Sequence, residues 1–116
     1  MGKTYNYHGI TPKVADTKDV NFEVAFVSDG NTGGTYITIQ DIGDFEIDDA
    51  GSVNLGKAAD LRDKVVSIGS KLANPVAEED TVAVNYLING KVIVEHSNPK
   101  KDDDQPRIAI TMMIKK

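Results

Sequence analysis

Acidic side chains gather between residues 41 and 49 of the 116-residue chain. Asp44, Glu46 and Asp48 alternate with apolar residues, so in an extended strand all three carboxylates project from one face. Asp41 lies close by in the sequence. Carboxylate oxygens are ligands that Ca²⁺ prefers in proteins. We favour a solvated face that protects a strand edge, and these four residues are the candidate ligands of an alternative calcium site.

Two glycine-containing segments carry partial ligand-binding motifs. Gly51–Ala58 matches a phosphate-binding P-loop except at its last position, where alanine replaces the hydroxyl residue that would hold magnesium. Asp29–Gly34 begins like an EF-hand calcium loop, but Gly33 replaces the third ligand and Gln40 stands where a bidentate glutamate belongs. We interpret the first segment as a glycine-punctuated loop and keep the second within an alternative small-ligand function.

Histidine and tyrosine add little further chemistry. His8 and His96 are too few for a histidine-only metal site, and we expect His96 to be hydrogen-bonded and partly buried at the rim of a sheet. Carbohydrate recognition usually needs an exposed aromatic platform, for which Tyr5, Tyr7 and Tyr36 are the candidates. Nothing local, such as a nucleophile elbow, supports a catalytic serine. We predict no catalytic residue and no cofactor.

Composition narrows the classes of function. The chain has 18 acidic and 13 basic residues, a net charge of -5, which argues against binding to nucleic acids or anionic membranes. The absence of cysteine removes disulfides, thiolate metal sites and cysteine nucleophiles. No apolar run has the length of a signal peptide or a membrane span, which favours a cytoplasmic location.

In the segments that must position these groups, apolar and polar residues alternate with a period of two, as in β-strands. The clearest predicted strand spans residues 20–27, where Val20, Phe22, Val24 and Phe26 share one face, as is typical of an antiparallel sheet with one solvated side. Residues 57–64 have a helical pattern of at most two turns and are expected to cross between sheets. Other predicted strands are 36–40, 64–72, 81–88, 91–97 and 108–114, a short one at Phe45 and Ile47, and an edge strand at Tyr5 and Tyr7.

The dipeptide Asn89-Gly90 lies between two of these strands and is typical of a two-residue type I′ turn. That register mixes charged residues into the apolar face of the hairpin. A three-residue loop, Ile88–Gly90, instead pairs Tyr86 with Val92 and keeps the apolar side chains on one face. We therefore predict a type I turn with a G1 bulge at Gly90.

Strands at intervals of about 8–12 residues, with almost no helix, predict an all-β fold. We expect a single domain over residues 1–116, an antiparallel β-sandwich of about seven or eight strands, with a small closed β-barrel as the alternative. The segments Asn74-Pro75 and Val82–Leu87 resemble immunoglobulin-like sandwiches in general, without their Cys–Trp–Cys core. That resemblance is architectural and implies no function.

These observations favour a non-catalytic structural or interaction module that binds another protein, or another copy of itself, through a strand edge or loop cluster. The alternative is a small-ligand binder for calcium or a carbohydrate. We interpret the charged segment Lys100–Asp104 as a mobile, solubilising loop. An enzyme is the least favoured class because clusters of catalytic or metal-ligating residues are lacking in the sequence.

Overall fold

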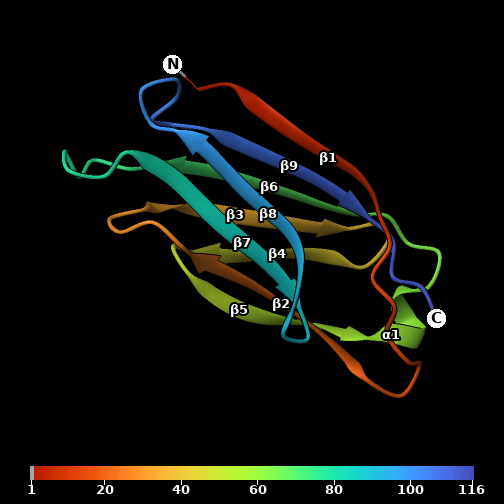
Figure 1. Ribbon diagram of the computed structural model, residues 1–116. Coiled ribbons are helices and arrows are strands. Elements are labelled where there is room, and N and C mark those ends of the chain that lie inside the picture. The colour runs from red at the N-terminus through yellow and green to blue at the C-terminus, as the bar shows by residue number, and fades with distance from the viewer. Residues whose placement is uncertain (1) are drawn as a thin grey trace.

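The computed structural model describes residues 2–116 as two stacked β-sheets (Figure 1). Along the chain the elements are β1 (Thr4–Ile10), β2 (Asp19–Phe26), β3 (Thr32–Ile39), β4 (Gly43–Asp48), β5 (Gly51–Lys57), α1 (Ala58–Leu61), β6 (Val66–Ala73), β7 (Thr81–Ile88), β8 (Lys91–Pro99) and β9 (Arg107–Met112). One sheet has the order β1-β9-β6-β3-β4 and the other the order β5-β2-β7-β8. Neighbouring strands are antiparallel except β1 and β9, which are parallel.

The fold is therefore all-β and consistent with a sandwich, and it is not a closed barrel, because both sheets have free edge strands. The described residues form nine strands, against the seven or eight predicted. The strand with Tyr5 and Tyr7 is at a sheet edge, as predicted. Helix α1 has four residues and links β5 of one sheet to β6 of the other. No helix within residues 2–116 is long and apolar enough to span a membrane.

The core lies between the two sheets and follows the predicted alternation. On β2, Val20, Phe22 and Val24 are buried, whereas Asn21 and Glu23 between them are exposed. A similar alternation recurs on β6 and β9, and on β7 the buried residues alternate with half-buried ones. Each strand therefore presents one row of side chains to the core and one row to solvent.

The β7–β8 hairpin differs from the prediction at its turn. Ile88 pairs with Lys91, so Asn89 and Gly90 form a two-residue turn. Both have positive φ, 49° for Asn89 and 83° for Gly90, as a type I′ turn requires. The predicted three-residue loop with a G1 bulge is therefore wrong.

The three-residue loop was predicted because it shifts the pairing of the two strands by one residue. In the structure this one-residue shift lies within strand β8. Leu87 pairs with Val92, whereas the preceding residue Tyr86 pairs with Val94. Ile93 is therefore the extra residue of a β-bulge. Beyond it the even-numbered positions of β8 face the core, while Val92, before the bulge, stays 45% exposed.

Three buried hydroxyl groups connect the two sheets. The hydroxyl of Tyr86, on β7, donates to Ser70 Oγ on β6 at 2.9 Å. Ser70 Oγ is also 2.7 Å from Thr35 Oγ1 on β3. All three residues are buried, and burial raises the pKa of Tyr86, so its hydroxyl stays protonated and can donate.

Candidate functional site

The outer face of the five-stranded sheet is organised around Tyr36, which is 54% exposed on β3. Tyr36 is aligned with Gly69 on β6, and Gly69 with Ala109 on β9. Because these two neighbours are small, the surface falls away beside the tyrosine and forms a shallow hollow of about 260 Å³. Lys71 and Arg107 also line this hollow and give it a basic border.

The local backbone does not require a glycine at position 69. Its φ lies outside the left-handed region, and β6 pairs regularly with both neighbouring strands through this residue. Apart from its chain neighbours, no atom lies within 4 Å of the place where a Cβ would stand. Glycine in a strand weakens it, and where no bulge or bend is present it is typical of a place that a ligand or another chain approaches closely.

A second hollow lies on the other side of Tyr36. It has a volume of about 310 Å³ and is lined by Thr38, Asp44 and Glu46, among others. Tyr36 therefore stands between a hollow with a basic border and one with an acidic border. A molecule that binds across Tyr36 meets opposite charges on the two sides.

The four predicted calcium ligands lie near the acidic hollow. Asp44, Glu46 and Asp48 are exposed and alternate along the edge strand β4, so they share its outer face. Asp41 lies in the preceding turn, and its carboxylate is 3.3 Å from Lys64 Nζ. Within residues 2–116, no group of three or more histidine, aspartate or glutamate side chains is placed to hold a metal ion. The structure therefore aligns three of these acids but does not bring the four together as a ligand cage.

The two partial motifs form ordinary elements of the sandwich. Residues Gly51–Lys57 are strand β5, whose backbone pairs with β2, so they do not form a loop around a phosphate, and the interpretation of this segment as a glycine-punctuated loop is wrong. Asp29, at the start of the EF-hand-like segment, lies in the β2–β3 connection. Its N–H donates to Glu79 Oε2 at 3.2 Å, and its carbonyl accepts a hydrogen bond from the Asn74 amide at 2.9 Å. This connection is therefore fastened to the neighbouring β6–β7 loop.

His96 lies on the inner side of β8 and is 2% exposed, so it is more deeply buried than predicted. Both amide protons of Asn98 are donated to the carbonyls of Pro99 and Asp103, which leaves Asn98 Oδ1 to accept from His96 Nε2 at 2.8 Å. His96 Nδ1 then accepts from the Tyr7 hydroxyl at 2.7 Å. Burial lowers the pKa of His96, which favours this neutral form. Both ring nitrogens serve the fold, as the sequence-based interpretation expected.

The three tyrosines proposed as a carbohydrate platform do not lie together. The rings of Tyr5 and Tyr7 pack against His96, with centroid distances of 4.6 Å and 6.0 Å, and so they turn toward the interior. Tyr36 lies on the outer face, on a different strand. The predicted three-residue platform is therefore wrong, and Tyr36 alone is an exposed aromatic side chain on this face.

The segment Lys100–Asp104 is not the loose loop that its charge predicts. Asp103 is 3% exposed, and its carboxylate accepts hydrogen bonds from the N–H groups of Lys3, at 2.7 Å, and Gln105, at 3.0 Å. The N–H of Lys100 donates to the carbonyl of Asp80 at 2.8 Å. A carboxylate that accepts two backbone N–H bonds fixes the chain around it. The prediction of a mobile loop is wrong for its centre.

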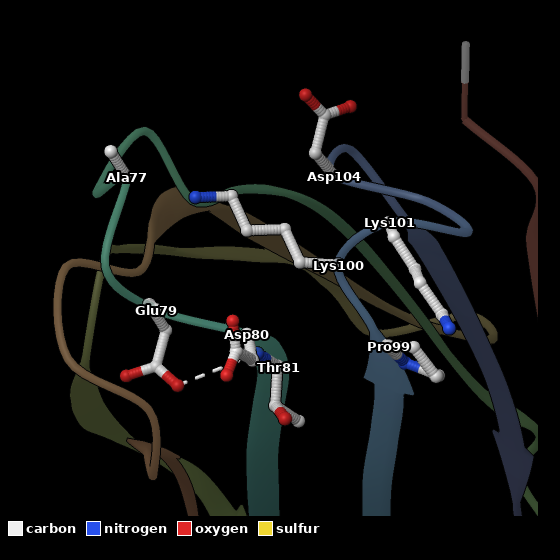
Figure 2. A pocket seen from close by; sticks show the side chains of 8 residues that line it. All are labelled: Ala77, Glu79, Asp80, Thr81, Pro99, Lys100, Lys101 and Asp104. Atoms are coloured by element: carbon white, nitrogen blue, oxygen red, sulfur yellow. Dashed lines mark hydrogen bonds between the residues drawn. The ribbon is translucent and has the colours of Figure 1, made fainter.

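A further hollow, of about 750 Å³, lies between the β6–β7 and β8–β9 loops (Figure 2). Its charged side chains do not converge, since Lys100 and Lys101 extend in different directions. The Lys100 ammonium donates to the carbonyl of Val76, and the Glu79 carboxylate accepts from the N–H of Thr81. Lys100 therefore ties the β8–β9 loop to the β6–β7 loop, Glu79 holds the end of its own loop, and the hollow has no focused set of ligand-binding groups.

Comparisons with protein-family models, with curated proteins and with solved structures gave no match to this chain. The candidate site therefore rests on the geometry of the sheet itself. The sequence alone identified Tyr36 and the acids but not the hollow, because strand register brings positions 36, 69 and 109 together. The available signal was a glycine inside the predicted strand 64–72.

Proposed function

We propose that this protein is a non-catalytic interaction module that binds another protein through the outer face of its five-stranded sheet. The observation that supports this proposal is the hollow above Gly69, beside the exposed ring of Tyr36. Exposed aromatic residues are enriched at protein interfaces. A strand without a side chain at its centre lets a partner approach the backbone closely.

The environment of the buried titratable groups supports the non-catalytic part of the proposal. An active site needs a nucleophile, a base and stabilising donors with free valences toward a substrate. His96 has both ring nitrogens bonded to Tyr7 and Asn98, and Asp103 has both carboxylate oxygens bonded to backbone N–H groups. These groups hold β1 and the β8–β9 loop in place and offer nothing to a substrate.

The edge strands support the face, rather than an edge, as the binding surface. β4 carries three exposed acids, and bulges or irregularities interrupt the pairing of β1, β5 and β8. Charges and bulges on edge strands are devices that oppose pairing with another chain. The immunoglobulin-like likeness enters this proposal only as architecture, two packed sheets of short strands, and it carries no function.

A carbohydrate ligand is the second candidate, favoured by the placement of the Tyr36 ring. The tip of the ring lies near Gly34, with Cε2 3.8 Å from the place of a Cβ at that position, and the side chain is 54% exposed, so part of the ring is available for stacking. Because the chain has no tryptophan, tyrosine fluorescence can report a sugar bound at Tyr36. Saturable quenching by a sugar that Tyr36→Ser removes favours this second function.

A photo-crosslinking amino acid at two positions tests the proposed protein partner. Thr38 is exposed on the outer face of β3, and Asn85 lies on the outward side of β7 in the other sheet, where it serves as a matched control. Irradiation with cell extract, followed by mass spectrometry, should give protein adducts from position 38 that Gly69→Val suppresses. Equal labelling from both positions, or no adduct from position 38, contradicts the proposal.

A further inference from the structure

We infer that the partner is a second copy of this chain, bound face to face through the five-stranded sheet about a two-fold axis parallel to the strands. This inference rests on the proposed function and names the occupant of the same surface. In a two-fold contact, if one residue of the first copy meets a second residue of the other copy, then the second residue of the first copy also meets the first residue of the other. The surface must therefore be complementary to itself.

Strand register arranges the outward side chains of β4, β3, β6 and β9 in straight rows across the sheet. The central row is Glu46, Tyr36, Gly69 and Ala109. The next row is Asp48, Gly34, Lys71 and Arg107. Acidic residues therefore lie at one end of the rows, basic residues lie toward the other end, and the tyrosine and the glycine are adjacent between them.

A two-fold axis midway between β3 and β6 makes this pattern self-complementary. It places β3 of one copy opposite β6 of the other, so each Tyr36 ring faces the hollow above Gly69 of the second copy. It also places β4 opposite β9, so Asp48 faces Arg107 of the second copy. One symmetry operation therefore matches shape and charge at the same time, twice in each dimer.

The charges that this contact uses are free in the single chain. The three ion pairs within the described residues involve none of Asp48, Lys71 and Arg107, and all three side chains are exposed. Each copy has a net charge of -5, which opposes association over long range. At an ionic strength of 0.15 M that repulsion is screened beyond about 8 Å, whereas pairs in contact are screened less.

The size of the face sets the expected affinity. The axis overlaps four strands, β4, β3, β6 and β9. At a spacing of about 4.8 Å, with about 20 Å of length presented by each strand, they give roughly 400 Å² for each copy. Stable interfaces bury about 800 Å² for each partner. We therefore expect a weak, reversible dimer with a dissociation constant of about 10 μM to 1 mM.

Light scattering after size-exclusion chromatography, together with sedimentation equilibrium at high concentration, tests the inference. The average mass should rise toward that of a dimer as the concentration increases through this range. Gly69→Val places a Cβ where no atom lies within 4 Å and puts a branched side chain into the hollow, so it should keep the protein monomeric, with an unchanged or higher melting temperature. Asn85→Val, on the opposite face, should leave dimerisation unchanged.

Charge exchange tests the predicted pairing and its symmetry. Asp48→Arg and Arg107→Asp should each weaken dimerisation at least tenfold, because each places like charges opposite one another at both ends of the contact. An equimolar mixture of the two variants should form heterodimers, since opposite charges then face one another at both ends. A variant that merely unfolds cannot give this recovery.

The outcomes separate this inference from the proposed function. A wild-type protein that stays monomeric at about 1 mM overturns the inference, as does a dimer that Gly69→Val leaves intact. If position 38 then crosslinks to a different protein in a manner that Gly69→Val suppresses, the proposed function stands and only the second copy is wrong. If the protein is monomeric and position 38 gives no adduct, both proposals are wrong.

Discussion

Replacing Ser70 by alanine should destabilise the protein more than replacing Tyr86 by phenylalanine, although each change removes one buried oxygen. Ser70 Oγ lies at the centre of the cluster of three hydroxyls, 2.9 Å from the Tyr86 hydroxyl and 2.7 Å from Thr35 Oγ1. The three residues are between 0% and 2% exposed, so water cannot replace a lost partner without a change in packing. The position of each oxygen in this series of hydrogen bonds therefore decides how much stability is lost when it is removed.

The expected magnitudes follow from how many buried hydroxyls each change leaves without a partner. Ser70→Ala strands the hydroxyls of Tyr86 and Thr35, and each buried unsatisfied group costs about 1–3 kcal/mol, which gives roughly 2–6 kcal/mol. Tyr86→Phe leaves the bond between Ser70 and Thr35 intact and should cost about 1 kcal/mol. Adding Thr35→Val and Tyr86→Phe to Ser70→Ala removes every stranded hydroxyl and should recover part of the loss.

Urea unfolding measures all of these differences directly. The free energy of unfolding of a domain of this size is about 5–15 kcal/mol, so each predicted loss is a large and measurable fraction of it. The midpoint should shift while the slope stays constant, because the surface exposed on unfolding is unchanged. The reasoning is refuted if Ser70→Ala costs no more than Tyr86→Phe, or if the triple variant is less stable than Ser70→Ala alone.

Two further predictions concern the turn and the buried histidine. Gly90→Ala should cost about 1–2 kcal/mol because φ is 83° and no neighbouring atom offers a compensating contact; Gly69→Ala, at an ordinary φ, is the control and should not lower the melting temperature. Burial lowers the pKa of His96 below its usual 6.5, although the hydrogen bond to Asn98 and the charge of Asp103 act in the opposite direction. The neutral, buried histidine therefore contributes its full stability above pH 6.5, and this contribution is lost as the pH falls through the lower pKa of the folded protein. Urea titrations from about pH 7 to pH 4 should show a smaller loss of stability in His96→Gln, with His8 present in both proteins; equal losses contradict the prediction.

The strands were predictable where one face is buried, because the alternation of apolar and polar residues directly records that burial. Predicted strand 20–27 differs from β2 by one residue at each end. The hairpin turn was not predictable by the same argument, because a parity change can lie either in the turn or in a bulge within the strand. Asn89 and Gly90 favoured the type I′ turn locally, and the bulge at Ile93 made that turn compatible with the buried face.

The candidate site was less predictable than the strands because its parts are distant in the sequence. Tyr36, Gly69 and Ala109 become neighbours only through the pairing of β3 with β6 and of β6 with β9. The burial of Asp103 depends on an N–H group that lies 100 residues away, on Lys3. The sequence pattern predicted that the acids of residues 41–49 and the charges of Lys100–Asp104 are all solvated. Tertiary hydrogen bonds decide which of these side chains are solvated, and they bury Asp103.

The outer face of the five-stranded sheet and the cluster of three buried hydroxyls are parts of one arrangement. Thr35 precedes Tyr36 on β3, and Ser70 follows Gly69 on β6, so the alternation of a strand places the hydroxyls directly behind the residues that form the hollow. The Tyr86 hydroxyl donates to Ser70, which is in turn bonded to Thr35, so both strands are fixed against the second sheet. A face held in this way loses little conformational freedom when it binds, which favours association through a small contact area. The same buried bonds therefore stabilise the fold and keep the Tyr36 ring and the hollow in register for the proposed second copy.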